Sequence, residues 1–161
     1  MTDAAATTAP YSASMIAKWF LAWADFEEEG ALSNLKLQKL LYYAQGHYLA
    51  RNNRPLFDDD IQAWAHGPVV PSVYREYSSY GSAAIPSPGD FDYESIDTDT
   101  HNLLASLWET HGSKSAWKLR MMTHDEAPWK DAFQENSRNI VIEPKKIKKY
   151  FASIRAANNA E

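Results

Sequence analysis

Apolar residues recur every three or four positions over much of the chain, which is the spacing that places them on one face of an α-helix. The strongest stripe follows Ser33 and consists of Leu37, Leu40, Leu41, Ala44 and Tyr48. Another stripe precedes it and consists of Met15, Ile16, Trp19, Phe20 and Trp23. Similar stripes over residues 103–108 and 147–154 extend the pattern. The chain is therefore predicted to be mainly helical.

Cap and turn residues mark the limits of the shorter helices. Pro71 suits the first turn of a third helix, because its missing N–H is not needed there. Ser113 is expected to cap a fifth helix that runs to Met122, and Asp125 is expected to cap a short helix over 127–133.

Two short stretches are candidate strands. Ile61–Ala65 alternates partly between apolar and polar residues, and Asn139–Ile142 is expected to pair with it. We predict a compact single-domain helical bundle of about six helices with a small two-stranded β element, spanning residues 12–157. Residues 1–11 are expected to be a disordered tail and residues 158–161 a flexible C-terminus.

Composition narrows the class of protein. The 161 residues include no cysteine, which excludes disulfides, thiolate zinc sites and cysteine nucleophiles. The formal net charge of −5 argues against a domain that binds nucleic acid through its overall field. No stretch approaches the ~18 consecutive apolar residues of a membrane span, and the first residues lack the basic charge of a secretory signal. We expect a cytoplasmic protein with neither membrane nor nucleic acid as partner.

Three blocks of sequence together resemble a known family. Residues 32–46 read LSNLKLQKLLYYAQG, residues 61–74 read IQAWAHGPVVPSVY, and a Thr-His pair stands shortly before Trp129. Over roughly residues 13–133 the chain resembles the Panacea domain family, also called SocA-like or phage-associated GepA-like proteins. The motif residues that carry the resemblance are Leu37, Gln38, Lys39, Leu40, Leu41, Tyr42, Trp64, Gly67, Pro68, Val69, Thr123, His124 and Trp129.

The resemblance implies a function that composition and periodicity do not show. The family is the antitoxin half of two-gene toxin–antitoxin pairs, and its members neutralise protein toxins of unrelated folds by direct contact. A SocA-type member can instead act as a proteolytic adaptor that delivers its toxin to an ATP-dependent protease such as ClpXP. The family implies a mostly helical fold with a small strand element and no catalytic residue. We therefore expect a type II antitoxin that is not an enzyme.

Aromatic and acidic residues outside the strongest helix are the candidates for contact with the toxin. Tyrosine offers a large contact area with a polar tip, although members of such a set also suit the core. An acidic run can meet basic residues of a partner, and it can equally be a solvated turn; a histidine near a proline can order its turn or join the interface. The candidate partner-binding residues are Trp64, His66, Tyr74, Tyr77, Tyr80, Asp58, Asp59 and Asp60.

Two other classes of function stay open from the residues alone. Lys36, Gln38 and Lys39 would read DNA if their helix and the one before it formed a helix-turn-helix, as in a repressor of its own operon. A hydrolase built on His66 or His124 is the weaker alternative, because adjacent residues on a helix point in different directions. No histidine spacing typical of a metal site and no glycine-rich phosphate loop is present, so neither metal nor cofactor is expected.

Overall fold

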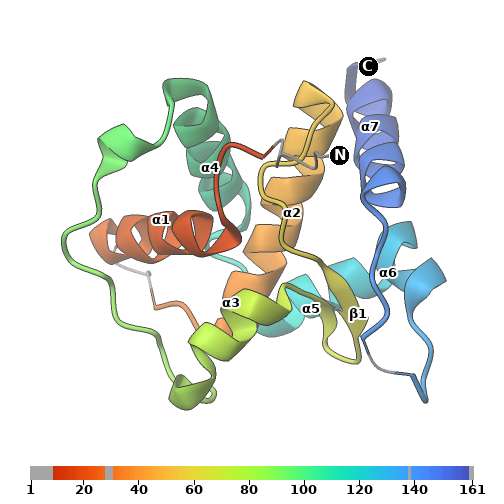
Figure 1. The fold of residues 1–161 in the computed structure, drawn as a ribbon, viewed down its shortest axis with the longest axis horizontal. Coiled ribbons are helices and arrows are strands. Elements are labelled where there is room, and N and C mark those ends of the chain that lie inside the picture. Colours follow the sequence, from red (N-terminus) through yellow and green to blue (C-terminus); the bar gives the residue numbers. More distant parts are fainter. Residues whose placement is uncertain (1–8, 28–30, 138, 160–161) are drawn as a thin grey trace, which may run out of the picture.

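The computed structural model describes residues 9–27, 31–137 and 139–159 of the chain. These residues form seven α-helices and one antiparallel hairpin, which confirms the predicted mainly helical fold with a small two-stranded element (Figure 1). The helices are α1 Ala13–Phe26, α2 Asn34–Asn52, α3 Pro71–Glu76, α4 Thr98–His111, α5 Ala116–His124, α6 Ala127–Ala132 and α7 Pro144–Asn159. The strands are β1 Gln62–Trp64 and β2 Gly67–Val69, and two 3₁₀ turns are η1 Ser78–Tyr80 and η2 Tyr93–Ser95.

Helix α2 is the centre of the molecule. It packs against α1, α3, α4, α5, α7 and β2, so that it is covered on every side (Figure 1). The predicted apolar stripe from Leu37 to Tyr48 is buried, but so are the polar residues of the other face, among them Lys36, Gln38, Lys39 and Gln45. Lys36, Gln38 and Lys39, the residues of the DNA-reading hypothesis, are therefore not at the surface that this hypothesis needs. A helix enclosed all round must bond its polar side chains internally, because a buried polar group without a partner is costly.

The two strands form a tight hairpin with Ala65 and His66 at its turn. Its register pairs Gln62 with Val69 and Trp64 with Gly67. The second strand is thus β2 rather than residues 139–142, where the sequence had placed it. Residues 139–142 do lie along the free edge of β1, where they make one isolated bridge before Pro144 begins α7.

Most helix starts follow from cap residues. Ser33 accepts a hydrogen bond from the backbone N–H of Lys36, as expected for the start of α2. The fifth helix is capped by Ser115 and not by Ser113. Asp125 ends α5 instead of capping the next helix, and the residue before α6 is Glu126, whose side chain makes no cap bond.

Tyr11 is packed against the domain although it was placed in the tail. Its hydroxyl donates to a carboxylate oxygen of Asp97 at 2.5 Å, and the backbone N–H of Asp97 donates back to the same hydroxyl at 2.8 Å. Residues 1–8 of the predicted tail lie outside the described residues. In the described part of the chain, no helix combines the length and the apolar character that a membrane crossing needs.

Candidate functional site

The motif residues of the sequence converge on the hairpin. We call the hairpin, together with the residues of α2, α5 and α6 that hold it, the hairpin platform. Gln38 accepts a hydrogen bond from the backbone N–H of Val70 at 2.8 Å and donates to Asn34 at 2.9 Å. The Lys39 ammonium donates to the carbonyl of Pro68 at 3.2 Å. These bonds attach the second strand to α2.

Gly67 allows the hairpin to approach α2 and α5 closely. Its φ of +113° is one that side-chain-bearing residues rarely adopt. A Cβ at this position would stand 2.7 Å from Cε of Lys39 and 2.9 Å from Oγ1 of Thr123. Glycine is therefore needed at this motif position both for its backbone conformation and because a side chain would not fit.

Trp129 holds the hairpin from the side of α6. Its indole N–H donates to the carbonyl of Trp64 at 2.7 Å. Its ring stacks on His124, with centroids 3.9 Å apart and planes 3° from parallel, and on Phe133 at 4.7 Å. The Thr-His pair and the later tryptophan of the third block thus form one packed unit, in which Thr123 is fully buried.

His124, Asp125 and Glu126 do not converge on one point. His124 lies flat against Trp129, and burial together with the charges of Arg120 and Lys39 lowers its pKa. Asp125 is exposed, while the Glu126 carboxylate is turned inward. Among the described residues no group of histidine and carboxylate side chains has the arrangement to hold a metal ion.

Glu126 is a buried carboxylate that the sequence did not single out. It accepts hydrogen bonds from the hydroxyls of Tyr42 at 2.9 Å and Tyr43 at 2.8 Å. Burial raises the pKa of Glu126. Burial and the neighbouring carboxylate also raise the pKa of both tyrosines above the usual range. The Tyr-Tyr pair within the first motif block was the available signal, since each hydroxyl needs a hydrogen-bond acceptor when its helix is buried.

The four predicted partner-binding aromatics lie in or next to α3: Tyr74 is in this helix, Tyr77 and Tyr80 follow it, and Trp64 of β1 contacts Tyr74. Trp64 and Tyr74 meet edge to face with ring centroids 5.0 Å apart. Tyr77 and Tyr80 lie 6.5 Å apart at the other end of this helix, and Tyr80 is 41% exposed. We call these four aromatic residues the α3 surface. Asp58 and Asp60 line a separate hollow with Pro144 and Ile147 of α7, next to Asp59.

The remaining predicted residues have other positions. Asp59 accepts from the backbone N–H of Ala13 at 3.0 Å and from the Ser72 hydroxyl at 2.6 Å. It thereby ties the starts of α1 and α3 together, whereas Asp58 and Asp60 are exposed. His66 is exposed on the hairpin turn, and partial burial and the charges of Arg120 and Lys39 lower its pKa.

The lysines proposed to read DNA are inside the molecule. Lys39 is 0% exposed and Lys36 only 8%. Lys36 donates to the carbonyl of Gly112 and lies 5.4 Å from the centre of the Trp108 ring. A major-groove contact by this pair is therefore contradicted, because a recognition helix must present its side chains at the surface.

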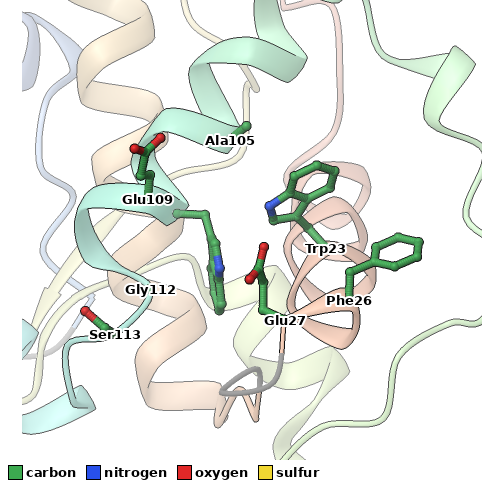
Figure 2. Close-up of a pocket in the computed structure, with 8 residues that line it drawn as sticks. Trp23, Phe26, Glu27, Ala105, Glu109, Gly112 and Ser113 are labelled. Carbon is green, nitrogen blue, oxygen red and sulfur yellow. The ribbon is translucent and has the colours of Figure 1, made fainter.

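A groove between α1 and α4 was not foreseen from the sequence (Figure 2). It encloses about 640 Å³. Both helices and the turns that follow them supply its walls, which are formed by Trp23, Phe26, Glu27, Ala105, Trp108, Glu109, Gly112 and Ser113. We call it the α1–α4 groove.

Comparison with known proteins supplies the family. The model of the family "Antitoxin SocA-like, Panacea domain" matches residues 37–130, which is more than half of the chain and includes the whole hairpin platform. The chain belongs to this antitoxin family. It is 37% identical over 109 residues to Antitoxin SocA of Caulobacter vibrioides (strain NA1000 / CB15N), a stretch that covers 61% of this chain and 58% of SocA. No solved structure matches the chain.

The family match agrees with the placement of the motif residues. Its limits, residues 37 and 130, enclose Gln38, Gly67 and Trp129. These residues are bonded or packed around one hairpin, so the match corresponds to a single structural unit of this antitoxin family. Helix α1 lies before the match, and α7 lies after it.

Proposed function

We propose that this protein is the antitoxin of a type II toxin–antitoxin pair and neutralises a cognate protein toxin in the cytoplasm by direct contact. Membership of the antitoxin family is the observation that carries the proposal. The α3 surface supports direct contact, because it gathers aromatic side chains that the fold leaves partly exposed.

The α3 surface has the composition of an interface centre. Tyrosine and tryptophan are enriched among the residues that dominate binding energy, since each buries a large area and loses few rotamers. Asn34 donates to the carbonyl of Tyr74 at 3.1 Å, and Trp64 is held through its own carbonyl by Trp129. These bonds hold the backbone, while the Trp64 ring is restrained by the bond of its indole N–H to Gln62 at 2.9 Å and by its contact with Tyr74. Order of this kind before a partner arrives lowers the entropy cost of binding.

The exposed carboxylates beside α3 suit the rim of the same interface. Asp58 and Asp60 flank Asp59, whose bond to Ser72 anchors their segment to the start of α3. Charges at a rim guide encounter more than they hold the complex. A toxin with a basic working surface would therefore be attracted to this side of the molecule.

A purified two-component mixture tests the proposal. The toxin encoded by the neighbouring gene is assayed for its own activity with and without this protein, in the absence of any protease. Direct neutralisation predicts loss of toxin activity at a one-to-one ratio. Full toxin activity within a demonstrated complex would contradict direct blocking and favour the adaptor hypothesis, in which the toxin disappears only when an ATP-dependent protease is added.

A further inference from the structure

We infer that the α1–α4 groove is a second binding site, and that it takes a lysine or arginine side chain flanked by apolar residues from the partner toxin. The inference rests on the proposed function in so far as the toxin is named as the occupant. The site itself is argued from the groove's rings, charges and shape.

The α1 wall of the groove is the outer edge of a rigid aromatic cluster. Trp23 stacks on Trp19 with ring centroids 5.2 Å apart and planes 14° from parallel. Trp23 also meets His101 of α4 at 5.2 Å, and His101 accepts a hydrogen bond from the Trp19 indole at 3.0 Å. Side chains fixed in this way keep the groove open and preformed, as binding sites usually are.

The opposite wall is equally fixed. The Trp108 ring of α4 is 7% exposed and packs so closely on Gly112 that a Cβ there would stand 2.6 Å from the ring. Lys36 approaches the same ring from α2 and is bonded to the carbonyl of Gly112. This ammonium is not among the groups that line the groove, and it is already engaged within the fold.

Two carboxylates give the groove a negative charge. Figure 2 shows the Glu27 carboxylate in the space between α1 and α4, next to Trp23, and Glu109 comes from α4. Among the described residues, no lysine or arginine lines the groove, and neither carboxylate forms an ion pair with a described residue. The Trp23 ring, one face of which is stacked on Trp19, lies beside the Glu27 carboxylate, and an aromatic ring next to a carboxylate favours a cation.

The position of Phe26 favours a polypeptide over a small cation as the occupant of the groove. It is 73% exposed at the rim of the groove and contacts Trp23 and Tyr93 with ring centroids 6.2 Å away. A long basic side chain fits between the walls while the residues beside it cover Phe26. This match of an apolar rim with a charged interior is the chemistry of a polypeptide and not of a free amine.

Charge reversal tests the inference against the toxin. Glu27→Lys and Glu109→Lys are each compared with Glu135→Lys, an exposed acid outside the groove lining. We expect the two groove variants to weaken toxin binding at least about tenfold, because like charges across an interface cost several kcal/mol. The Glu135→Lys control is expected to bind as the unchanged protein does, and circular dichroism verifies that all three are folded.

A peptide probe tests the site without the toxin. The indole resonances of Trp23 and Trp108 are followed by NMR during titration with the tripeptide amide Ac-Leu-Arg-Leu-NH₂, and then with Ac-Leu-Gln-Leu-NH₂. The arginine peptide is expected to shift both signals, and the glutamine peptide is expected to leave them unchanged. Equal shifts by both peptides, or by free arginine amide as by the arginine peptide, would overturn the inference.

A negative result in one experiment can be distinguished from a negative result in the other. Unaltered toxin binding by Glu27→Lys and Glu109→Lys would overturn the groove as a toxin site while neutralisation through α3 stands. Absence of toxin binding by the unchanged protein would overturn the proposed function and the toxin as occupant, even where the arginine peptide still identifies the groove as a cation site.

Discussion

The hairpin platform and the α1–α4 groove use the same kinds of residue in opposite ways. In the platform the charged and polar side chains of Lys39, Gln38 and Glu126 point inward, and each is bonded to a partner within the fold. In the groove the carboxylates of Glu27 and Glu109 and the ring of Phe26 remain accessible. The inward side chains of the platform stabilise the fold, whereas the accessible carboxylates and ring of the groove remain available to bind a partner.

The family match covers the two regions to different extents. It begins at residue 37, so it includes the platform, the α3 surface and the α4 wall of the groove, whereas α1 lies before it. Most of the motif residues are buried or bonded within the fold, so we expect toxin binding to depend mainly on other residues. We expect partner choice to depend on surfaces that the platform positions, namely the α3 surface and the groove.

The largest effect is expected when the platform is broken at Gly67. Gly67→Ala combines a positive φ with a Cβ that meets Lys39 and Thr123, so unfolding should become easier by roughly 2–5 kcal/mol. Gly81→Ala is the matched control, because Gly81 also has a positive φ but nothing within 4 Å of the new Cβ. Denaturant unfolding measures both. Equal destabilisation would show that the close contact contributes nothing.

A pH-dependent effect is expected from Lys39. Burial lowers the pKa of Lys39 to about 7, whereas the unfolded chain has its ordinary value of 10.5. Between these values the unfolded state binds more protons, so the free energy of unfolding should rise from about pH 7 to about pH 10.5. Lys39→Met should remove this contribution to the slope, while Lys118→Met on the exposed side of α5 should keep it. Unfolding titrations at several pH values measure it; a slope unchanged in Lys39→Met would contradict the buried, shifted amine.

Much of the platform was predictable from the sequence, but not its arrangement. The apolar stripe from Leu37 to Tyr48 gave the position of α2, and the motif blocks marked most of the residues that meet at the hairpin. Periodicity describes only one face of a helix, however. It placed Lys36 and Lys39 on another face and left their role open, whereas the fold covers that face with α4, α5 and β2.

The groove could not be predicted from the sequence, for a related reason. Trp23 belonged to an apolar stripe expected to pack inward, and nothing along the chain shows that α4 stands far enough from α1 to leave a hollow. The strand pairing was predicted in part: residues 139–142 do bridge β1 as expected, but the sequence did not indicate that Gly67–Val69 forms the longer pairing with β1. Spacing between elements is set by long-range packing, which a local pattern does not contain.

Substitutions in the α3 surface should weaken toxin binding, and at the exposed Tyr80 they should do so without a loss of stability. Tyr80→Ala removes a ring that is 41% exposed, and Tyr77→Ala removes its half-buried neighbour. We expect each to weaken toxin binding by more than ~1 kcal/mol, a typical hot-spot scale, and Tyr80→Ala to leave the unfolding midpoint unchanged. Calorimetric titration with the toxin gives the first quantity, and thermal unfolding gives the second. Loss of stability in Tyr80→Ala without loss of affinity would assign this ring to the fold.

The smallest effect is expected from the acids beside α3, and it should fall on the rate of association. Asp58→Lys with Asp60→Lys changes two exposed charges but spares Asp59, which holds the starts of α1 and α3 together. Rim charges steer encounter, so the association rate should fall about three- to tenfold with little change in dissociation, and the difference should shrink at high salt. Stopped-flow mixing with the toxin measures both rates. Glu94→Lys with Glu135→Lys carries the same change in net charge on other exposed positions and separates a local effect from a global one. If that control slowed association equally, net charge alone would explain the rate, and Asp58 and Asp60 would have no place in the interface.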